Sequence, residues 1–243
     1  MSRTSDIDAA DCLQLMGVDV WVPRQSGGES AASDLDARDN QSVDSDADIP
    51  VPTDTWDALQ AAVARCERCG LHQSRTQTVF GVGNPNADLL VIGEAPGAEE
   101  DKRGEPFVGR AGKLLDSMLH AIGLSRSQVF IANILKCRPP NNRDPRPEEV
   151  AACQSYLAQQ IASIEPKLIL AVGRIAAQNL LNVTTPIGKM RGQRYAYGET
   201  DIPVLVTYHP AYLLRSPKEK RKAWQDLKQV MAALNTAAET SAG

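Results

Sequence analysis

The sequence predicts an α/β fold: a three-layer sandwich in which helices cover both faces of a central, mainly parallel four-stranded sheet. Two features of the chain support this fold class. Short unbroken apolar runs, typical of strands buried on both faces, alternate with longer segments of helical periodicity. In addition, 42% of the 243 residues are hydrophobic, which is enough for one packed core. We therefore expect a single large domain.

The predicted elements follow one another in a regular order. A first helix begins near Thr53 or Asp54 as its cap and carries Trp56, Leu59 and Val63 on one face. Unbroken apolar runs predict the strands, at residues 88–92, 129–134, 167–172 and 204–206. Amphipathic periodicity predicts the remaining helices, at residues 111–122, 147–164, 174–181 and 217–234.

Polar or glycine-rich loops follow three of these strands, at residues 93–97, 133–142 and 209–215. The carboxyl ends of parallel strands lie at one edge of a sheet, and the ligand sites of such folds lie in the loops beyond them. We therefore expect the three loops to converge and to form the functional site.

The N-terminal part of the chain differs from the rest in charge and composition. Residues 1–54 carry 12 acidic and 3 basic residues, which leaves 18 acidic and 23 basic residues for 55–243. Ser, Asp, Gly, Ala and Pro dominate the end of this part, and such a segment cannot bury enough apolar surface to fold. The predicted divisions are an apolar island at 1–25, a disordered acidic linker at 26–53, a folded domain at 54–236 and a disordered tail at 237–243. The island either packs on the domain or acts as a docking peptide.

No apolar run approaches the roughly 20 residues that a membrane-spanning helix needs, and acidic residues follow the first Met instead of an apolar signal core. We expect a soluble, cytoplasmic monomer. Its basic body suits a polyanionic partner such as nucleic acid.

Four of the five cysteines form a pattern typical of a metal site. Cys66 and Cys69 are a close pair, Cys137 lies in a predicted loop and Cys153 on a predicted helix, whereas Cys12 stands apart in the acidic part. Four thiolates suit a [4Fe-4S] cluster or a structural zinc ion, and the alternative is a set of unrelated buried cysteines. Zinc ribbons usually pair their ligands as two close doublets. The wide separation of Cys137 and Cys153 therefore favours iron-sulfur.

Three further features suggest ligand chemistry, and each has a structural alternative. Residues 93–97 can point backbone N–H groups at an anion or carbonyl, or form an ordinary strand-to-helix turn. Phe107, in a polar glycine-rich stretch, is either a stacking platform for a base or a buried loop anchor. His209, directly after a strand, either donates to a developing oxyanion or has a structural role.

Taken together, these motifs resemble the family 4 uracil-DNA glycosylases, the iron-sulfur branch of that superfamily. The resemblance runs from about residue 56 to residue 234. It rests on single residues and on short segments. The residues are Cys66, Cys69, Asn133 and Cys153, and the segments are 93–97, 106–109, 136–140 and 209–213. It implies the glycosylase superfamily fold, a [4Fe-4S] cluster on the four cysteines, and hydrolysis of the N-glycosidic bond of deoxyuridine in single- or double-stranded DNA.

The resemblance also implies a base pocket. Phe107 would stack on the flipped uracil, the Asn133 amide would read its O4 and N3 edge, and backbone N–H groups at Glu94 and Ala95 would bind O2. A neutral His209 would donate to O2 of the departing uracil anion.

Two of the implied roles fall at positions where this chain differs from better-known members of the superfamily. The Asp that positions water elsewhere is replaced by Ala95, as in family 4, so Glu94 would orient the water, helped by Asn142. The Tyr that excludes thymine elsewhere is replaced by Gly97, so Glu100 would fill that space.

Contacts with DNA are implied outside the pocket as well. Leu213, in a turn after His209, matches the wedge that fills the gap left by the flipped base. Arg138 and Arg215 are the expected phosphate contacts.

The sequence is also compatible with two other functions, and one segment implies a partner protein. The chain could be a non-catalytic iron-sulfur replication accessory that binds DNA, or an enzyme that acts on free nucleotides. The island at residues 1–25, which includes Trp21, is faintly similar to the opening peptide of the psi subunit of the bacterial replicative polymerase. This similarity implies a replication-protein partner for that segment.

Overall fold

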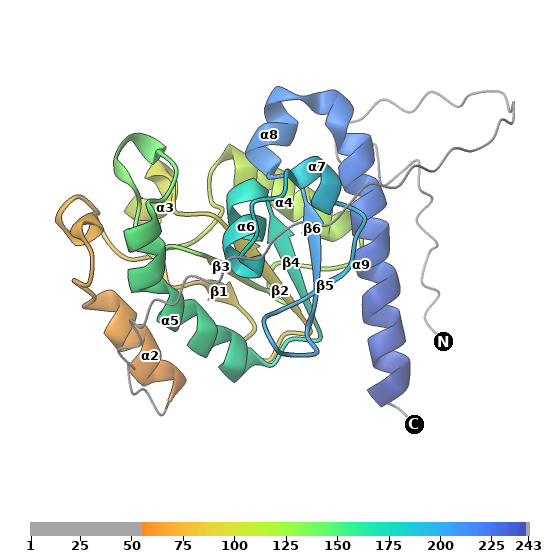
Figure 1. Cartoon of the computed structure of the whole chain (residues 1–243), viewed down its shortest axis with the longest axis horizontal. Coiled ribbons are helices and arrows are strands. Elements are labelled where there is room, and N and C mark those ends of the chain that lie inside the picture. Colours follow the sequence, from red (N-terminus) through yellow and green to blue (C-terminus); the bar gives the residue numbers. More distant parts are fainter. Residues whose placement is uncertain (1–54, 242–243) are drawn as a thin grey trace, which may run out of the picture.

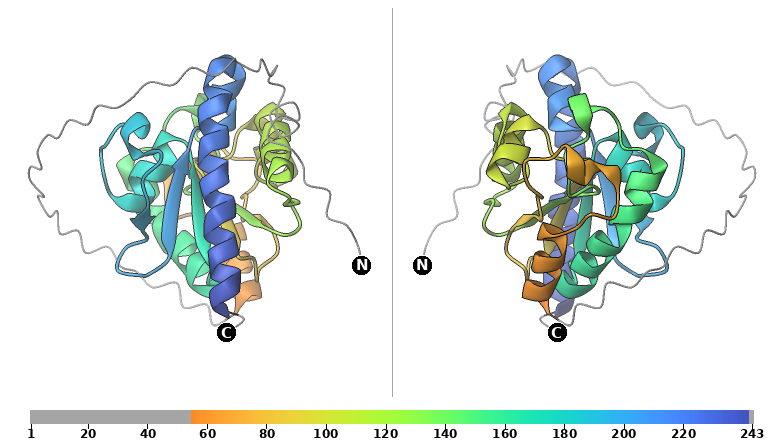
Figure 2. Two further views of the ribbon diagram at one scale, coloured as in Figure 1. Left: turned by 90° about the vertical axis from the view of Figure 1, so that its right-hand side faces the viewer. Right: turned by 90° about the vertical axis from the view of Figure 1, so that its left-hand side faces the viewer.

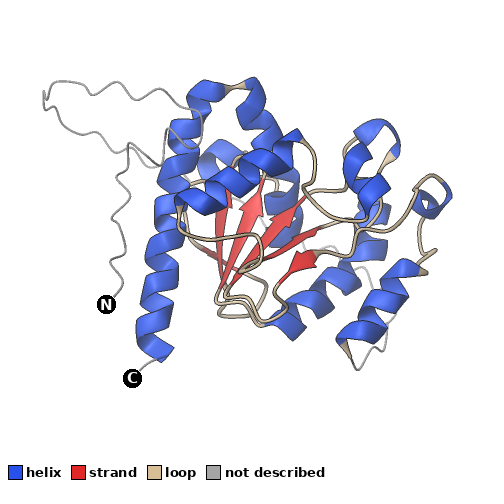
Figure 3. Ribbon diagram, turned by 180° about the vertical axis from the view of Figure 1, so that it is seen from behind, coloured by secondary structure: helices blue, strands red, loops and turns tan. Residues whose placement is uncertain are grey.

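A computed structural model describes residues 55–241, and these residues form a sandwich around one sheet. The strand order is β1-β3-β2-β4-β6-β5 (Figures 1 and 3). The strands are β1 (Val82–Gly83), β2 (Leu89–Gly93), β3 (Phe130–Asn133), β4 (Leu168–Val172), β5 (Tyr195–Ala196) and β6 (Pro203–Thr207). The four inner strands are parallel, which confirms the predicted central sheet. The two edge strands are antiparallel and were not predicted, because two residues are too few to show a periodicity.

The residues of each inner strand alternate between two apolar cores, as strand geometry requires. In β2, Leu90 and Ile92 pack on one side of the sheet, and Leu89 and Val91 pack on the other. The first core is closed by α2 (Trp56–Ala64), α5 (Pro147–Ile164), α6 (Arg174–Leu181) and α7 (Ile187–Met190). The second is closed by α4 (Arg110–Ala121), α8 (Pro210–Arg215) and α9 (Lys220–Ser241) (Figure 2). The predicted three-layer sandwich is therefore confirmed.

The helix boundaries differ from the prediction in a few places. Helix α2 is capped by Thr55, whose side chain accepts a hydrogen bond from the Ala58 N–H at 3.2 Å, and not by the predicted Thr53 or Asp54. Helix α9 continues to Ser241, so the predicted end at Leu234 and the predicted disorder of residues 237–241 are wrong.

Short elements were missed altogether. Besides α7 and α8, they are α3 (Ala98–Arg103) and the 3₁₀ turns η1 (Gly70–Gln73) and η2 (Pro140–Asn142), whereas residues 217–219, predicted as the start of the last helix, form the separate turn η3 (Pro217–Glu219). None exceeds six residues, which is too short for an amphipathic pattern to be recognised.

Among the helices that the structure describes, none combines the length and apolar character needed to cross a membrane. The predicted docking island at residues 1–25 and the linker at 26–53 lie outside the described residues.

Candidate active site and cysteine-lined cavity

The ends of β2 and β3 hold two of the expected loops together. Gly93 and Asn133 are partners in the parallel register. Beyond the strands, the N–H groups of Ile134 and Leu135 donate to the carbonyls of Gly93 and Glu94, both at 3.0 Å. The loop that carries Glu94 is therefore fixed against the loop that carries Asn133.

Phe107 and Asn133 meet at Gly93. A Cβ on Gly93 would lie 2.6 Å from Phe107 Cζ and 2.4 Å from Asn133 Oδ1, so only glycine allows both side chains to come this close. Phe107 has a positive φ of 54°, which is rare for a bulky residue. Arg126 donates to the carbonyls of Phe107 and Pro106 and so fixes this conformation.

The Asn133 side chain is buried, with 2% of its surface exposed, and its Oδ1 has no hydrogen-bond partner within the described residues. Lys136 Nζ donates to the Asn133 backbone carbonyl, at 3.0 Å, and to Gln160 Oε1, at 2.6 Å, and not to Asn133 Oδ1. An unpaired buried acceptor costs about 1–3 kcal/mol. A planar ligand that lies against Phe107 and carries an N–H would satisfy it.

His209 caps α8 and lies close to the Phe107 ring, with 5.6 Å between the ring centroids and 31° between the planes. Its Nδ1 accepts a hydrogen bond from the Ala211 N–H at 3.1 Å. Because a backbone N–H can only donate, Nδ1 carries no proton and Nε2 is the donor. Burial, together with the positive charge of Arg215, lowers the pKa of His209 to about 4, and Glu100 opposes this shift weakly. The imidazole is therefore neutral at physiological pH.

Glu94 faces an open cleft of about 410 Å³ that is also lined by His209. Burial raises the pKa of Glu94 to about 7, with a further increase from Asp144 and an opposing effect of Arg174. A carboxyl group with this pKa can accept or release a proton near neutral pH.

Glu100 occupies the space beside Gly97, where a Cβ would lie 2.7 Å from its Oε2. Its Oε1 accepts hydrogen bonds from the N–H groups of Val108 and Gly109, at 3.0 and 3.1 Å. The carboxylate therefore joins the loop at residues 93–97 to the loop after Phe107.

Other expected residues lie farther from this group. Ala95 packs on the first core. Asn142 is exposed and accepts a hydrogen bond from Arg138 Nε at 2.8 Å, and neither residue lines the cleft, whereas Arg215 does. Sequence reasoning missed Asp144 and Arg174, which line the cleft and form an ion pair at 2.8 Å. The position of Arg174, two residues after the end of β4, was the signal that could have found it.

The expectation that Leu213 lies in an exposed turn is wrong. The segment is helix α8, and Leu213 is 0% exposed because it points into the second core. Its neighbours Tyr212 and Leu214 are exposed instead, at 37% and 36%. The helix, which was not predicted, decides which of these side chains faces outward.

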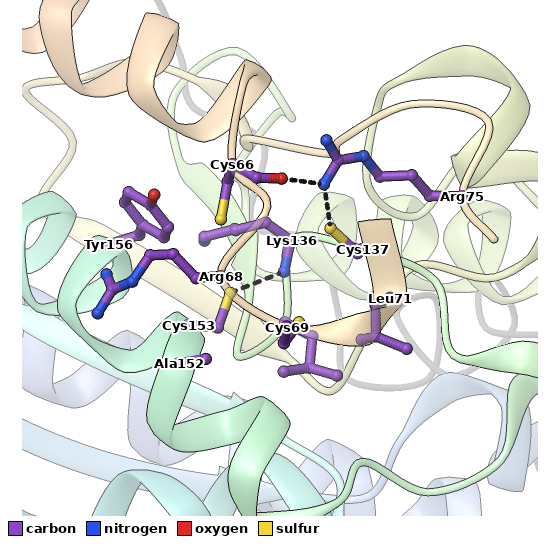
Figure 4. A pocket seen from close by; sticks show the side chains of 11 residues that line it. Cys66, Arg68, Cys69, Leu71, Arg75, Lys136, Cys137, Ala152, Cys153 and Tyr156 are labelled. Atoms are coloured by element: carbon purple, nitrogen blue, oxygen red, sulfur yellow. Dashed lines mark hydrogen bonds between the residues drawn. The ribbon is translucent and has the colours of Figure 1, made fainter. Parts of the chain in front are cut away.

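The four cysteines line one cavity, as the spacing suggested (Figure 4). Cys66 and Cys69 come from the segment after α2, Cys137 from the loop after β3, and Cys153 from α5. Arg75 donates to Cys137 Sγ at 3.1 Å, and the Lys136 N–H donates to Cys153 Sγ at 3.3 Å.

No disulfide links these cysteines. Burial raises the pKa of the Cys137 thiol, and it raises that of Cys153 to about 12. Within residues 55–241, no three His, Cys, Asp or Glu side chains are grouped closely enough to hold a single metal ion.

The Phe107 ring, the buried Asn133 amide and the neutral His209 imidazole thus lie together at the carboxyl edge of the parallel sheet of an α/β fold. A sequence model of the uracil DNA glycosylase superfamily matches residues 80–228. The chain is 44% identical over 184 residues to the type-4 uracil-DNA glycosylase of Archaeoglobus fulgidus, covering 73% of this chain and 92% of that protein. It is 46% identical over 157 residues to the type-4 enzyme of Thermotoga maritima, covering 63% and 80%.

The chain therefore belongs to the type-4 uracil-DNA glycosylases, within the uracil DNA glycosylase superfamily.

The buried His209 makes a testable contribution to stability. Its pKa is about 4 in the folded protein and 6.5 when unperturbed, so the unfolded state binds the extra proton first as the pH falls. Relative to a His209→Gln variant, the wild type should lose about 3 kcal/mol of unfolding free energy between pH 7 and pH 4. Urea denaturation of both proteins across this range measures the difference. If the difference in unfolding free energy between the two proteins stays the same from pH 7 to pH 4, folding does not lower the pKa of His209.

Proposed function

We propose that this protein excises uracil from DNA by hydrolysing the N-glycosidic bond of deoxyuridine, which leaves an abasic site for base excision repair. The observation that carries the proposal is the buried, unpaired Oδ1 of Asn133 beside Phe107. Uracil presents an N3–H to such an acceptor, whereas cytosine presents an unprotonated N3 and would leave it unpaired.

In the reaction, the C1′–N1 bond breaks and both electrons pass to the uracil ring. The Nε2–H of His209 donates to uracil O2, where negative charge develops, and a donor of this kind contributes about 3 kcal/mol. The backbone N–H groups of Glu94 and Ala95 support the same oxygen. The imidazole is suited to this role because it is neutral and cannot protonate the base outright.

The water oxygen forms the new bond to C1′, and Glu94 orients the water and accepts its proton. The pKa of Glu94 is about 7, so a large fraction of the carboxyl groups is ionised at neutral pH. Asn142 has no part in this step, because its exposed side chain accepts a hydrogen bond from Arg138 and does not line the cleft that Glu94 faces.

Glu100 excludes thymine. Its carboxylate fills the space beside Gly97 and is held there by two backbone N–H groups, so a 5-methyl group on the base would meet a fixed charged side chain.

We assign the DNA wedge to Leu214, in place of Leu213. A wedge enters the stack from the protein surface, and Leu214 is exposed on α8 whereas Leu213 is buried beneath the helix. Arg215 and Arg138 bind phosphates of the strand that carries the uracil.

The cysteine cavity holds a [4Fe-4S] cluster on Cys66, Cys69, Cys137 and Cys153. In such a cluster each cysteine binds a different iron, so the ligand sulfurs lie farther apart than the ligands of one ion. This agrees with four thiols around one cavity that are not grouped for a single metal ion. The donors from Arg75 and Lys136 stabilise sulfur ligands of this kind. The cluster stabilises the loop shared with the base pocket.

Beyond the domain, residues 1–25 bind a replication protein, joined to the enzyme by the acidic linker at 26–53. The enzyme itself acts as a monomer.

The activity is tested with a uracil-containing oligonucleotide and alkaline cleavage of the abasic product. The wild type should release uracil, and Asn133→Leu should lower kcat/KM at least 100-fold. The same variant should be no less stable than the wild type to urea, because an apolar side chain of similar size replaces an unpaired acceptor. Failure of the wild type to form abasic sites would contradict the proposal. So would an active Asn133→Leu variant.

The two leucines of α8 should behave in opposite ways. Leu214→Ala should lower uracil release from duplex DNA about tenfold and leave the free energy of unfolding within about 0.5 kcal/mol of the wild type. Leu213→Ala should cost about 2–5 kcal/mol of stability, because it creates a cavity in the second core. Duplex cleavage assays and urea denaturation measure both effects. Normal activity of Leu214→Ala on duplex DNA would contradict the wedge assignment.

The cluster is tested by removing one ligand. Cys153→Ala should lower the iron and sulfide content of the purified protein from about four of each per chain and should reduce its stability to heat. Cys12→Ala is the control, since Cys12 lies outside the described residues and is not a predicted ligand. Zinc in place of iron in the wild type would contradict the assignment.

A further inference from the structure

Most of the wall of the open cleft beside the base pocket lies outside the group proposed to hold the uracil ring. Its volume of about 410 Å³ lies within the range of small-molecule sites, yet neither Phe107 nor Asn133 lines it. It shares only Glu94 and His209 with the catalytic group described above. The rest of its wall includes apolar and aromatic side chains, namely Ile175, Ile187, Tyr208 and Tyr212. A flipped uracil therefore leaves most of this cleft for another group.

Tyr212 gives the cleft an exposed aromatic surface on a rigid support. Its ring lies 5.0 Å from that of Tyr208, at an angle of 46°. The guanidinium of Arg191 lies 4.4 Å from the Tyr208 centroid. Arg191 is itself fixed by two hydrogen bonds to the buried Asp226, at 2.7 and 2.8 Å. Yet 37% of Tyr212 remains exposed and available to a ligand.

Two arginines line the cleft, Arg174 and Arg215, and they differ in whether a carboxylate already pairs with them. Arg174 is paired with Asp144 at 2.8 Å and bonded to Gln178 at 3.1 Å. Arg215 forms no ion pair with a carboxylate of the described chain. It stands three residues after Tyr212 on α8, so both side chains lie on the same face of the helix. An aromatic ring beside an unpaired cation is the arrangement with which proteins bind single-stranded nucleic acid.

We propose that this cleft is a second base-binding subsite, which takes the base next to the uracil on the same strand. The base stacks on Tyr212, and Arg215 binds the phosphate between the two nucleotides. The inference rests on the proposed glycosylase function, because it is the bound uracil that brings its neighbour to the cleft. The neighbour is one phosphodiester link away, so its base is within reach of this wall when the uracil is bound.

The subsite is tested with single-stranded oligonucleotides that carry one central uracil. In two further substrates, an abasic tetrahydrofuran residue replaces the nucleotide on the 5′ or on the 3′ side of the uracil. For the wild type, one of these replacements should lower kcat/KM about tenfold, since stacking of one base has an effect of this size. Tyr212→Ala should lower kcat/KM about tenfold on the full substrate and cause no further loss on that abasic substrate. Tyr212→Phe should behave as the wild type does.

Met231→Ala is the matched control, because Met231 is also 37% exposed but lies on α9 outside the cleft. It should respond to the abasic neighbours as the wild type does. Three results would overturn the subsite: indifference of the wild type to both replacements, equal sensitivity to both, or the same loss for Tyr212→Ala on the full and the abasic substrates. In each of these cases the wild type still releases uracil. A wild type that releases none contradicts the glycosylase function instead.

Discussion

The site depends on one close approach at the carboxyl end of β2. Gly93 lies opposite Asn133 in the parallel register, and it is touched from two sides by side chains that a Cβ would displace. This contact places the Phe107 ring against the Asn133 amide, and His209 completes the group from the end of β6. A glycine at this position is therefore a geometric requirement of the pocket and not a flexible point in the loop.

The loop after β3 joins the base pocket to the cysteine cavity. Lys136 donates through Nζ to the Asn133 carbonyl and to Gln160, and through its backbone N–H to Cys153. The adjacent Cys137 accepts a hydrogen bond from Arg75. The cysteine cavity and Asn133 are thus connected through a few residues of one loop, and the structural role proposed for the cluster rests on this connection.

Several features of the pocket are unfavourable for folding by themselves. Phe107 has a positive φ, Asn133 Oδ1 is buried without a partner, and the neutral His209 is kept from its usual protonation. The first two cost stability at neutral pH, and the third costs stability as the pH falls from 7 toward 4. Such features persist where the surroundings enforce them and where a ligand uses them. Their coincidence at one edge of the sheet distinguishes this site from the other loops.

The sequence by itself determined the four inner strands, the long helices and the grouping of the cysteines, because burial on two faces and helical periodicity are properties of local pattern. The resemblance to family 4, which rests on the order of the motifs, also implied that Phe107, Asn133 and His209 share one site. Only the tertiary structure decided what each side chain faces. Leu213 is buried and Leu214 exposed because a six-residue helix, too short to be recognised, rotates one inward and the other outward. The tertiary structure also decided that Asp144, Arg174 and Tyr212 line the cleft. Their positions depend on packing between segments that are distant in the chain, which no local pattern records.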